Sequence, residues 1–148
     1  MPDIQINLLA VLACVVVGFF FSYAWYTPLF GKAWANEMGF DHDEPMPGGQ
    51  LARGLIMTVV GVLLISFVQA NTMAAWHPAS WGVTVATPSP PYENALQAAF
   101  FTWLGYFVPV HLSGVAWARR SWKLFAIDAG YHLVLLLIVS FILAYAGR

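Results

Sequence analysis

Four long apolar stretches dominate the sequence and restrict what the chain can fold into. They cover approximately residues 6–26, 55–75, 95–118 and 124–145. A helix needs roughly 20 apolar residues to cross the hydrocarbon core of a bilayer, and each stretch is about that long. None of them alternates polar and apolar residues, as a membrane-spanning strand does. The sequence therefore predicts an all-α fold, a bundle of four transmembrane helices.

The composition agrees with a chain that lies mostly inside a membrane. Only 9% of its 148 residues are charged, whereas an average soluble domain has about 25%. Too little chain remains outside the four stretches for a soluble domain, so residues 1–148 are expected to form a single integral membrane domain. The Lys and Arg residues number 6 and the Asp and Glu residues 7, so there is no basic surface for nucleic acid. The single cysteine, Cys14, excludes an internal disulfide.

The basic residues predict the orientation in the membrane. An even number of spans puts the loop after the first helix and the loop after the third helix on the same side. These two loops hold most of the Lys and Arg residues: Lys32, Arg53, Arg119, Arg120 and Lys123. The other side has only Arg148. By the positive-inside rule the two basic loops are cytoplasmic, and both termini and the loop 76–94 lie outside.

A short amphipathic helix is expected after the first transmembrane helix, in the stretch "WYTPLFGKAWANEMGF". Pro28 should end the first helix or turn the chain, because proline has no backbone N–H to donate. Apolar residues then recur at four-residue spacing: Phe30, Trp34 and Met38. This spacing is typical of a helix that lies along the membrane interface.

Small residues on the first helix predict a close helix–helix seam. They recur at four-residue steps: Ala10, Cys14, Gly18 and Ser22. In lipid, small residues let helix backbones approach closely and so favour association. The last helix carries a second group of small residues: Ala126, Ala129 and Gly130. The seam formed by the first helix could lie within one subunit or between two copies. A homo-oligomer is expected.

The last apolar stretch, "KLFAIDAGYHLVLLLIVSFILAYA", contains an acid and an imidazole four residues apart, Asp128 and His132. This spacing puts both on one face of a helix. At ~1.5 Å per residue, His132 lies about 13.5 Å beyond Lys123, and His111 lies about 12 Å before Arg119. Ionisable groups at such depth are costly in lipid, so they should face the bundle. The three residues are predicted to form one polar intramembrane site.

The segments "INLLAVLA", "WYTPLFGKAWANEMGF" and "KLFAIDAGYHLVLLLI" resemble a bacterial membrane-protein family known as domain of unknown function 1761. The resemblance runs from the first helix to the last. It implies a four-helix integral membrane protein, in the bacterial inner membrane, and it implies no activity. It also draws attention to particular residues in the two specific motifs: Trp25, Tyr26, Pro28, Gly31, Lys32, Trp34, Asp128, Gly130, Tyr131 and His132.

Several roles remain open for the polar site. In a purely structural role, Asp128 pairs with a nearby basic residue or with His132, because the start of a helix favours an anion. His111 then satisfies the Gly105 carbonyl, which Pro109 leaves without a donor. In a functional role the site is a proton or small-solute pathway, since histidine changes charge near neutral pH. Aromatic residues would then line its cytoplasmic mouth: Trp25, Tyr26 and Tyr131.

Two further interpretations have less support in the sequence. His111 and His132 could bind a metal or a b-type haem, and Asp128 and His132 could act as acid and base of a membrane enzyme. No additional ligands, nucleophile motif or phosphate loop accompany them. His42, between acids in "DHDEPMPGG", is a potential metal ligand, but such loop clusters are mostly solvated.

The sequence thus predicts a non-enzymatic membrane protein without a cofactor, metal or nucleic-acid partner. Its expected partners are the lipid bilayer and either further copies of itself or other membrane proteins. The favoured function is a small proton- or solute-conducting transport element. The alternative is a structural or accessory subunit of a larger complex, because the second helix offers few polar residues to a pathway: Thr58, Ser66 and Gln69.

Overall fold

The computed structural model describes residues 4–146, and the described part of the chain is helical, with no strand. The helices are α1 (Leu8–Ala24), α2 (Gly31–Met38), α3 (Gly48–Trp76), α4 (Pro91–Thr102), α5 (Val108–Trp117) and α6 (Trp122–Ala146). Four segments are long and apolar enough to cross a membrane: Leu8–Leu29, Gly48–Trp76, Pro91–Trp117 and Trp122–Ala146. The predicted all-α bundle with four apolar spans is confirmed.

The helices extend beyond the apolar stretches that predicted them. α3 begins at Gly48 where residue 55 was expected, and α4 begins at Pro91 where residue 95 was expected. Each start follows a proline, Pro47 or Pro90, in an extended conformation. Proline is well tolerated at a helix start, because the first N–H groups have no partner inside the helix. Hydropathy alone misses such polar first turns, since they lie outside the apolar core.

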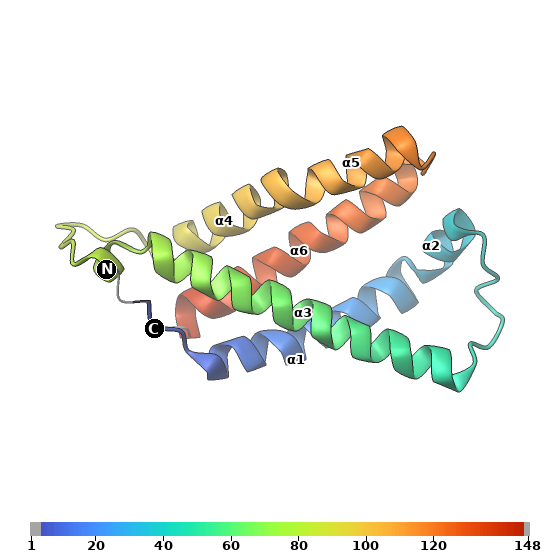
Figure 1. Cartoon of the computed structure of the whole chain (residues 1–148), viewed down its shortest axis with the longest axis horizontal. Helices are drawn as coiled ribbons and strands as arrows, with labels where there is room; N and C mark the ends of the chain where they lie inside the picture. Colours follow the sequence, from blue (N-terminus) through green and yellow to red (C-terminus); the bar gives the residue numbers. More distant parts are fainter. Residues whose placement is uncertain (1–3, 147–148) are drawn as a thin grey trace.

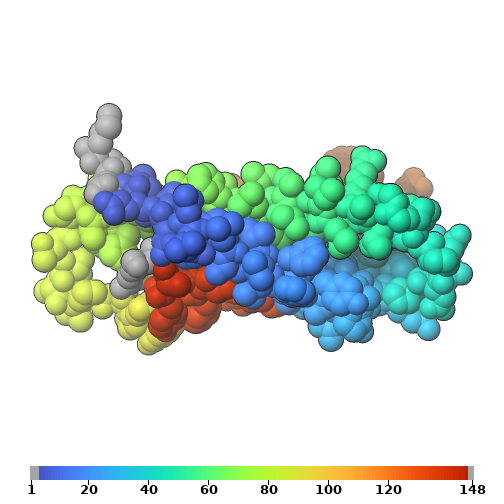
Figure 2. All heavy atoms as spheres, turned by 90° about the horizontal axis from the view of Figure 1, so that it is seen from below, coloured from blue at the N-terminus to red at the C-terminus, as the bar shows by residue number. Residues whose placement is uncertain are grey.

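α6 is the central helix of the bundle. Half of its most apolar window (50%) is buried, compared with 6% for the span Pro91–Trp117. α1 packs against both α3 and α6, and α4 packs along α6. Figure 1 shows that the N-terminal and C-terminal ends of the chain and the α3–α4 loop lie at one end of the bundle, with α2 at the other. In Figure 2, α1 and α3 run side by side along one long face.

Two spans contain a wide, π-helical turn next to a proline. In the turn Trp25–Leu29, the Phe30 N–H donates to the Trp25 carbonyl at 2.8 Å, five residues back. A similar turn, Trp103–Phe107, comes before Pro109. The wider turn makes room for a proline ring that would clash with the carbonyl four residues earlier. The π-helical turn carries the first span one residue past Pro28, and the span ends at Leu29, so Pro28 lies at the end of the first helix as predicted.

The small residues of α1 form a seam inside the subunit. Four of them are buried: Ala10, Cys14, Gly18 and Ser22. A Cβ atom placed on Gly18 would lie 2.6 Å from Cγ1 of Val62 on α3 and 3.1 Å from Cδ1 of Leu135 on α6. Gly130 differs from the prediction, because a Cβ atom there would meet the Trp25 ring at 3.6 Å, an ordinary contact. Gly130 is therefore not required for close packing.

The amphipathic helix α2 forms as expected, and Gly31 and Ala35 pack on the protein beside part of the predicted apolar face. Gly31 and Ala35 are buried, whereas the predicted apolar residue Met38 is 37% exposed. A Cβ atom on Gly31 would lie 2.6 Å from the Tyr26 carbonyl oxygen, so glycine permits this approach. The helix ends at Gly39, whose φ of 77° is left-handed and suits glycine. The small residues thus share the contact with two of the predicted apolar residues, because the Phe30 ring packs on Trp25 at 4.5 Å and the Trp34 ring on Tyr26 at 5.6 Å.

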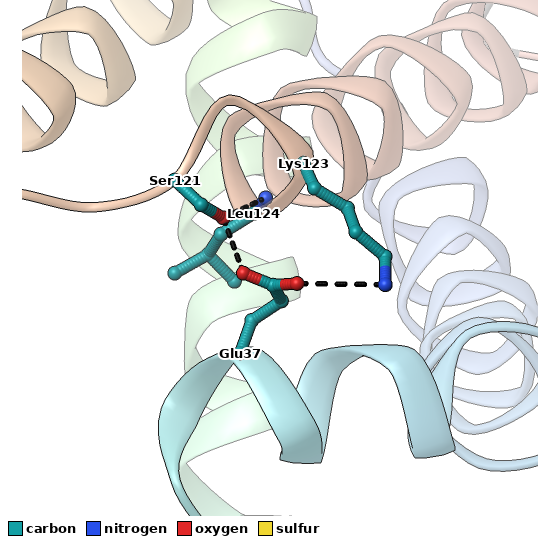
Figure 3. A network of polar contacts seen from close by, with 4 residues as sticks. All are labelled: Glu37, Ser121, Lys123 and Leu124. Carbon is teal, nitrogen blue, oxygen red and sulfur yellow. Dashed lines mark hydrogen bonds and ion pairs between the residues drawn. The ribbon is translucent and has the colours of Figure 1, made fainter.

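A polar network joins α2 to the start of α6 (Figure 3). The Glu37 carboxylate accepts a hydrogen bond from the Ser121 hydroxyl and pairs with Nζ of Lys123 at 3.4 Å. The Ser121 hydroxyl oxygen in turn accepts from the Leu124 N–H at 3.0 Å, which caps α6. Because Lys123 pairs with Glu37, it is not the partner of Asp128.

Candidate functional site

The Asp128 side chain is bound by a tyrosine from the π-helical turn that follows α1. The Tyr26 hydroxyl donates to Oδ1 of Asp128 at 3.0 Å, and both groups are partly buried. The one ion pair in the described part of the chain joins Lys123 to Glu37, so the predicted pairing of Asp128 with a basic residue is wrong. A phenol donor lets a carboxylate lie within the bundle without a counter-ion, because a hydrogen bond to the charged group offsets part of its desolvation.

The two intramembrane histidines touch. Nε2 of His111 on α5 lies 3.1 Å from Nδ1 of His132 on α6, as their similar depths predicted. Nδ1 of His132 also lies 2.8 Å from the main-chain carbonyl of Asp128. Two structural predictions therefore need correction. His132 bonds the Asp128 carbonyl and not its carboxylate, and His111 bonds His132 and not the Gly105 carbonyl.

These distances determine which ring nitrogen of each histidine carries the proton when both rings are neutral. A carbonyl oxygen can only accept, so Nδ1 of His132 must carry the proton in its bond to Asp128. Nε2 of His111 faces the same N–H, so in the neutral pair it presents its lone pair and its own proton sits on Nδ1. One proton on His132 thus faces two acceptors, one of which is a base that can take it up. A proton can pass between these rings with little movement.

Two tryptophans fix α6 beside the histidine pair. Nε1 of Trp25 donates to the Ile127 carbonyl at 3.2 Å, and Nε1 of Trp103 donates to the Ala129 carbonyl at 2.8 Å. With the His132 bond between them, three consecutive carbonyls of α6 have side-chain partners. Trp103 was not among the predicted site residues. Its signal in the sequence was a tryptophan in mid-span, whose N–H needs a partner when it is buried.

Tyr131 points its hydroxyl at α1 and away from the acid. Its oxygen lies 2.6 Å from the Ser22 hydroxyl, and its ring stacks on Phe21 with centroids 5.7 Å apart. The ring also lies against Tyr26, with centroids 4.9 Å apart. Of the three aromatic residues expected at a cytoplasmic mouth, Tyr26 alone binds Asp128, while Trp25 and Tyr131 tie the first span to α6.

A second polar cluster lies nearer the end of the bundle that carries the termini. Nε2 of Gln69 donates to the Ser140 hydroxyl at 2.9 Å, and the Thr102 hydroxyl donates to Oε1 of Gln69 at 3.2 Å. The hydroxyl of Ser66, one turn away on α3, is buried without a hydrogen-bond partner. Of the sparse polar residues of α3, Gln69 therefore meets partners on α4 and α6. The sequence did not indicate this, because Thr102 and Ser140 are isolated in apolar surroundings.

Apolar side chains separate the two polar groups along α6. His132 and Ser140 are eight residues apart, or about 12 Å at ~1.5 Å per residue. The intervening residues Leu135, Leu136 and Val139 are almost completely buried. The bundle thus has a polar site toward the α2 end, an apolar layer, and the polar cluster Thr102–Gln69–Ser140.

The site does not have the form of a metal or haem centre. The described residues contain no group of three or more His, Cys, Asp or Glu side chains suited to a metal ion, and this includes the surroundings of His42. Two histidines that ligate one haem iron approach it from opposite faces of the porphyrin. His111 and His132 bond each other directly, so the ring cannot lie between them in this arrangement.

A comparison with protein families places the chain in one of them. A family model described as "Protein of unknown function (DUF1761)" matches residues 9–144, which includes nearly all of the four spans and both polar groups. No curated protein and no solved structure matches the chain. Because the match covers nearly the whole sequence, this protein belongs to the DUF1761 family of proteins of unknown function.

Proposed function

We propose that this protein is a small transport element that conducts protons through the polar groups on α6. The observation that carries the proposal is the direct contact of His111 and His132, with one proton facing a second basic nitrogen. Imidazole takes up and releases protons near neutral pH, which makes a histidine pair a suitable relay. Ionisable groups at membrane depth are costly, and they are commonly found on proton and ion pathways.

The Tyr26–Asp128 pair extends the relay toward the α2 end. Asp128 lies one helical turn before His132, on the same face of α6. Asp128, His111 and His132 are each only partly buried within the subunit, so the relay borders one flank of the bundle. α5, which carries His111, has no buried residue along its length. A proton entering from the basic loops would meet Asp128 first and the histidines next.

The apolar layer is the barrier of this pathway. Leu135, Leu136 and Val139 separate the histidines from the cluster Thr102–Gln69–Ser140. Conduction would need water to enter this layer transiently, and apolar constrictions are known to gate pores by wetting and drying. The buried, unpartnered hydroxyl of Ser66 supplies a polar group on the neighbouring α3.

The second candidate function is an accessory subunit of a larger membrane complex. One observation favours it: the tyrosine and tryptophan donors around Asp128 all tie α1 or the third span to α6, as a structural network would. In this role the half-buried histidine pair would be covered by another subunit at the weakly packed α5 flank.

Proton flux into proteoliposomes distinguishes the two candidates. We expect the purified protein to acidify or alkalinise vesicles under an imposed potassium diffusion potential, as followed with an enclosed pH-sensitive dye. His132→Gln and Asp128→Asn should abolish this flux while the thermal melting of the protein in detergent stays unchanged. His77→Gln, in the α3–α4 loop, is the matched control and should conduct normally.

Two results would contradict conduction. The first is wild-type flux equal to that of empty vesicles, and the second is full flux in His132→Gln. Either would favour the accessory role, in which Asp128→Asn is nearly silent because an amide still accepts the Tyr26 hydrogen bond.

A further inference from the structure

An open cleft of about 980 Å³ lies at the end of the bundle that carries the termini. Its walls come from residues 5–7 just before α1, from the end of α3, from α4 and from the end of α6, and the turn Pro78–Trp81 borders it. Binding pockets for small organic molecules have volumes of about 300–1,000 Å³. The cleft is therefore large enough for a ligand. Among the polar residues of the proposed proton pathway, Thr102 is the one that lines it in the described part of the chain.

The polar part of the cleft wall is uncharged. It consists of amides and hydroxyls: Gln5, Asn7, Thr72, Ser80, Asn94, Gln97 and Thr102. No Lys, Arg, Asp or Glu lines the cleft, and His77 is its one titratable side chain in residues 4–146. A charged group placed here would lose water without gaining a counter-charge, which is unfavourable. The wall therefore selects against ions and in favour of neutral polar groups.

Two amides of this wall are available for a ligand. Asn94 and Gln97 are three residues apart on α4, so they lie on the same face of the helix. Within residues 4–146 neither side chain makes a hydrogen bond to the protein. By contrast, Asn7 is already engaged, because it caps α1 and donates to the Ala146 carbonyl at 2.8 Å. An amide offers both donors and an acceptor, which matches ligand hydroxyls that also do both.

The rest of the wall is apolar and continues into the lipid-facing surface. Met73, Phe101 and Leu143 line the cleft. Phe101 is also 66% exposed within the span Pro91–Trp117, so it borders both the cleft and the membrane. A molecule in the cleft can therefore keep its polar part among the amides while an attached chain extends into lipid.

We propose that this cleft binds an uncharged, polyhydroxylated headgroup, such as the sugar of a neutral glycolipid. The amides of Asn94 and Gln97, with the Thr72 hydroxyl, hydrogen-bond the headgroup, and the apolar wall at Phe101 contacts the start of its chains. The proposal does not depend on proton conduction, because it uses the opposite end of the bundle.

Lipid retention measured by native mass spectrometry tests the chemistry of the ligand. The protein, in a zwitterionic detergent, is titrated with a monoglucosyl diacylglycerol, with phosphatidylglycerol and with plain diacylglycerol. We expect at least tenfold tighter retention of the glucosyl lipid than of the other two. Equal retention of all three, or preferred retention of phosphatidylglycerol, would overturn the proposal. Methyl glucoside has the sugar but no acyl chains, so it distinguishes a lipid headgroup from a free sugar. If it binds as tightly as the glucosyl lipid, the ligand is a free sugar.

Variants test the location. The double variant Asn94→Ala with Gln97→Ala should reduce retention of the glucosyl lipid at least tenfold. Thr72→Val should weaken retention of the glucosyl lipid by a smaller factor. This variant replaces the double variant as the test if the double variant does not fold. Thr58→Val is the matched control: both threonine hydroxyls donate to the carbonyl four residues back at 2.9 Å, but only Thr72 lines the cleft. Unchanged retention in all folded cleft variants would place the lipid elsewhere and contradict the proposal.

Discussion

Gly18 shows how a single residue sets the distance between helices in this bundle. It lies where α1 meets both α3 and α6, and the space for a Cβ atom is taken by Cγ1 of Val62 at 2.6 Å and Cδ1 of Leu135 at 3.1 Å. The hydrophobic effect does not drive helices together in lipid, so close packing provides much of the association energy. Any side chain at Gly18 must therefore push helices apart or displace its neighbours.

We predict that Gly18→Ala destabilises the protein by about 1–3 kcal/mol, the usual cost of overpacking. Adding Val62→Ala should recover part of this loss, because it removes the Cγ1 atom that the new methyl group meets. Unfolding in mixed micelles with increasing denaturing detergent measures the change. Gly61→Ala is the matched control, since a Cβ atom there has no neighbour within 4 Å. Equal stability of Gly18→Ala and Gly61→Ala would contradict the seam.

The spacing of small and polar residues predicted which side chains face inward, but not their partners. Helical periodicity correctly placed Gly18 at a seam, and equal depth brought His111 and His132 together. Spacing cannot distinguish the carboxylate of residue 128 from its carbonyl, because both lie one turn from His132. Trp103 was missed because a tryptophan in an apolar run reads as packing until its N–H donor is considered.

At the scale of elements, α2 is held to α6 by one polar junction. Glu37 of α2 accepts from the Ser121 hydroxyl and pairs with Lys123, so its attachment depends on the charge of one carboxylate (Figure 3). The hydrogen bond from Ser121 and then the nearby ammonium lower the pKa of Glu37 from its usual value of 4.5. A lowered folded-state pKa means that the ionised carboxylate stabilises the docked helix.

We predict that docking of α2 weakens in acid. Stabilisation by Glu37 is complete above the unfolded pKa of 4.5 and is lost as the pH falls through the lower folded value. Hydrogen exchange of residues 31–38, compared between wild type and Glu37→Gln at each pH, measures this. The variant should exchange faster near neutral pH, and the difference should shrink as the pH falls below 4.5 and disappear below the folded pKa. Glu93→Gln, far away on α4, is the control, and a difference that persists in acid would contradict the junction.

The positions of the helices followed from hydropathy, whereas their irregular turns did not. Pro28 and Pro109 were expected to end or kink a helix, and both spans absorb the proline by a π-helical turn. A sequence shows that proline removes an N–H, but the response depends on whether neighbouring side chains hold the helix together. Here Trp25 and Trp103, at the two π-turns, both bond to α6 and keep each span in place.

On the scale of the whole molecule, the two ends of the bundle differ in chemistry. The end with α2 carries the basic residues and leads to Asp128 and the histidine pair, while the end with the termini carries an uncharged cleft. Figure 1 shows the α2–α3 and α5–α6 connections at one end of the bundle and the α3–α4 loop at the other. The proposals for proton entry and for a neutral lipid headgroup therefore concern opposite faces of the membrane, and the orientation of the protein decides which face is which.

We predict that the α2 end is cytoplasmic. It carries Lys32 in α2, Arg53 in α3 and three further basic residues at the α5–α6 connection. Basic loops of this kind are retained on the cytoplasmic side during membrane insertion. The test uses single cysteines in a Cys14→Ala background: Asp43→Cys between α2 and α3, and Ser89→Cys between α3 and α4. In intact spheroplasts of a bacterial expression host, a membrane-impermeant maleimide should label the cysteine at 89 and should reach the one at 43 only after permeabilisation. The reverse pattern would invert the molecule, and equal labelling of both sites would show insertion in two orientations; either result would contradict the predicted topology.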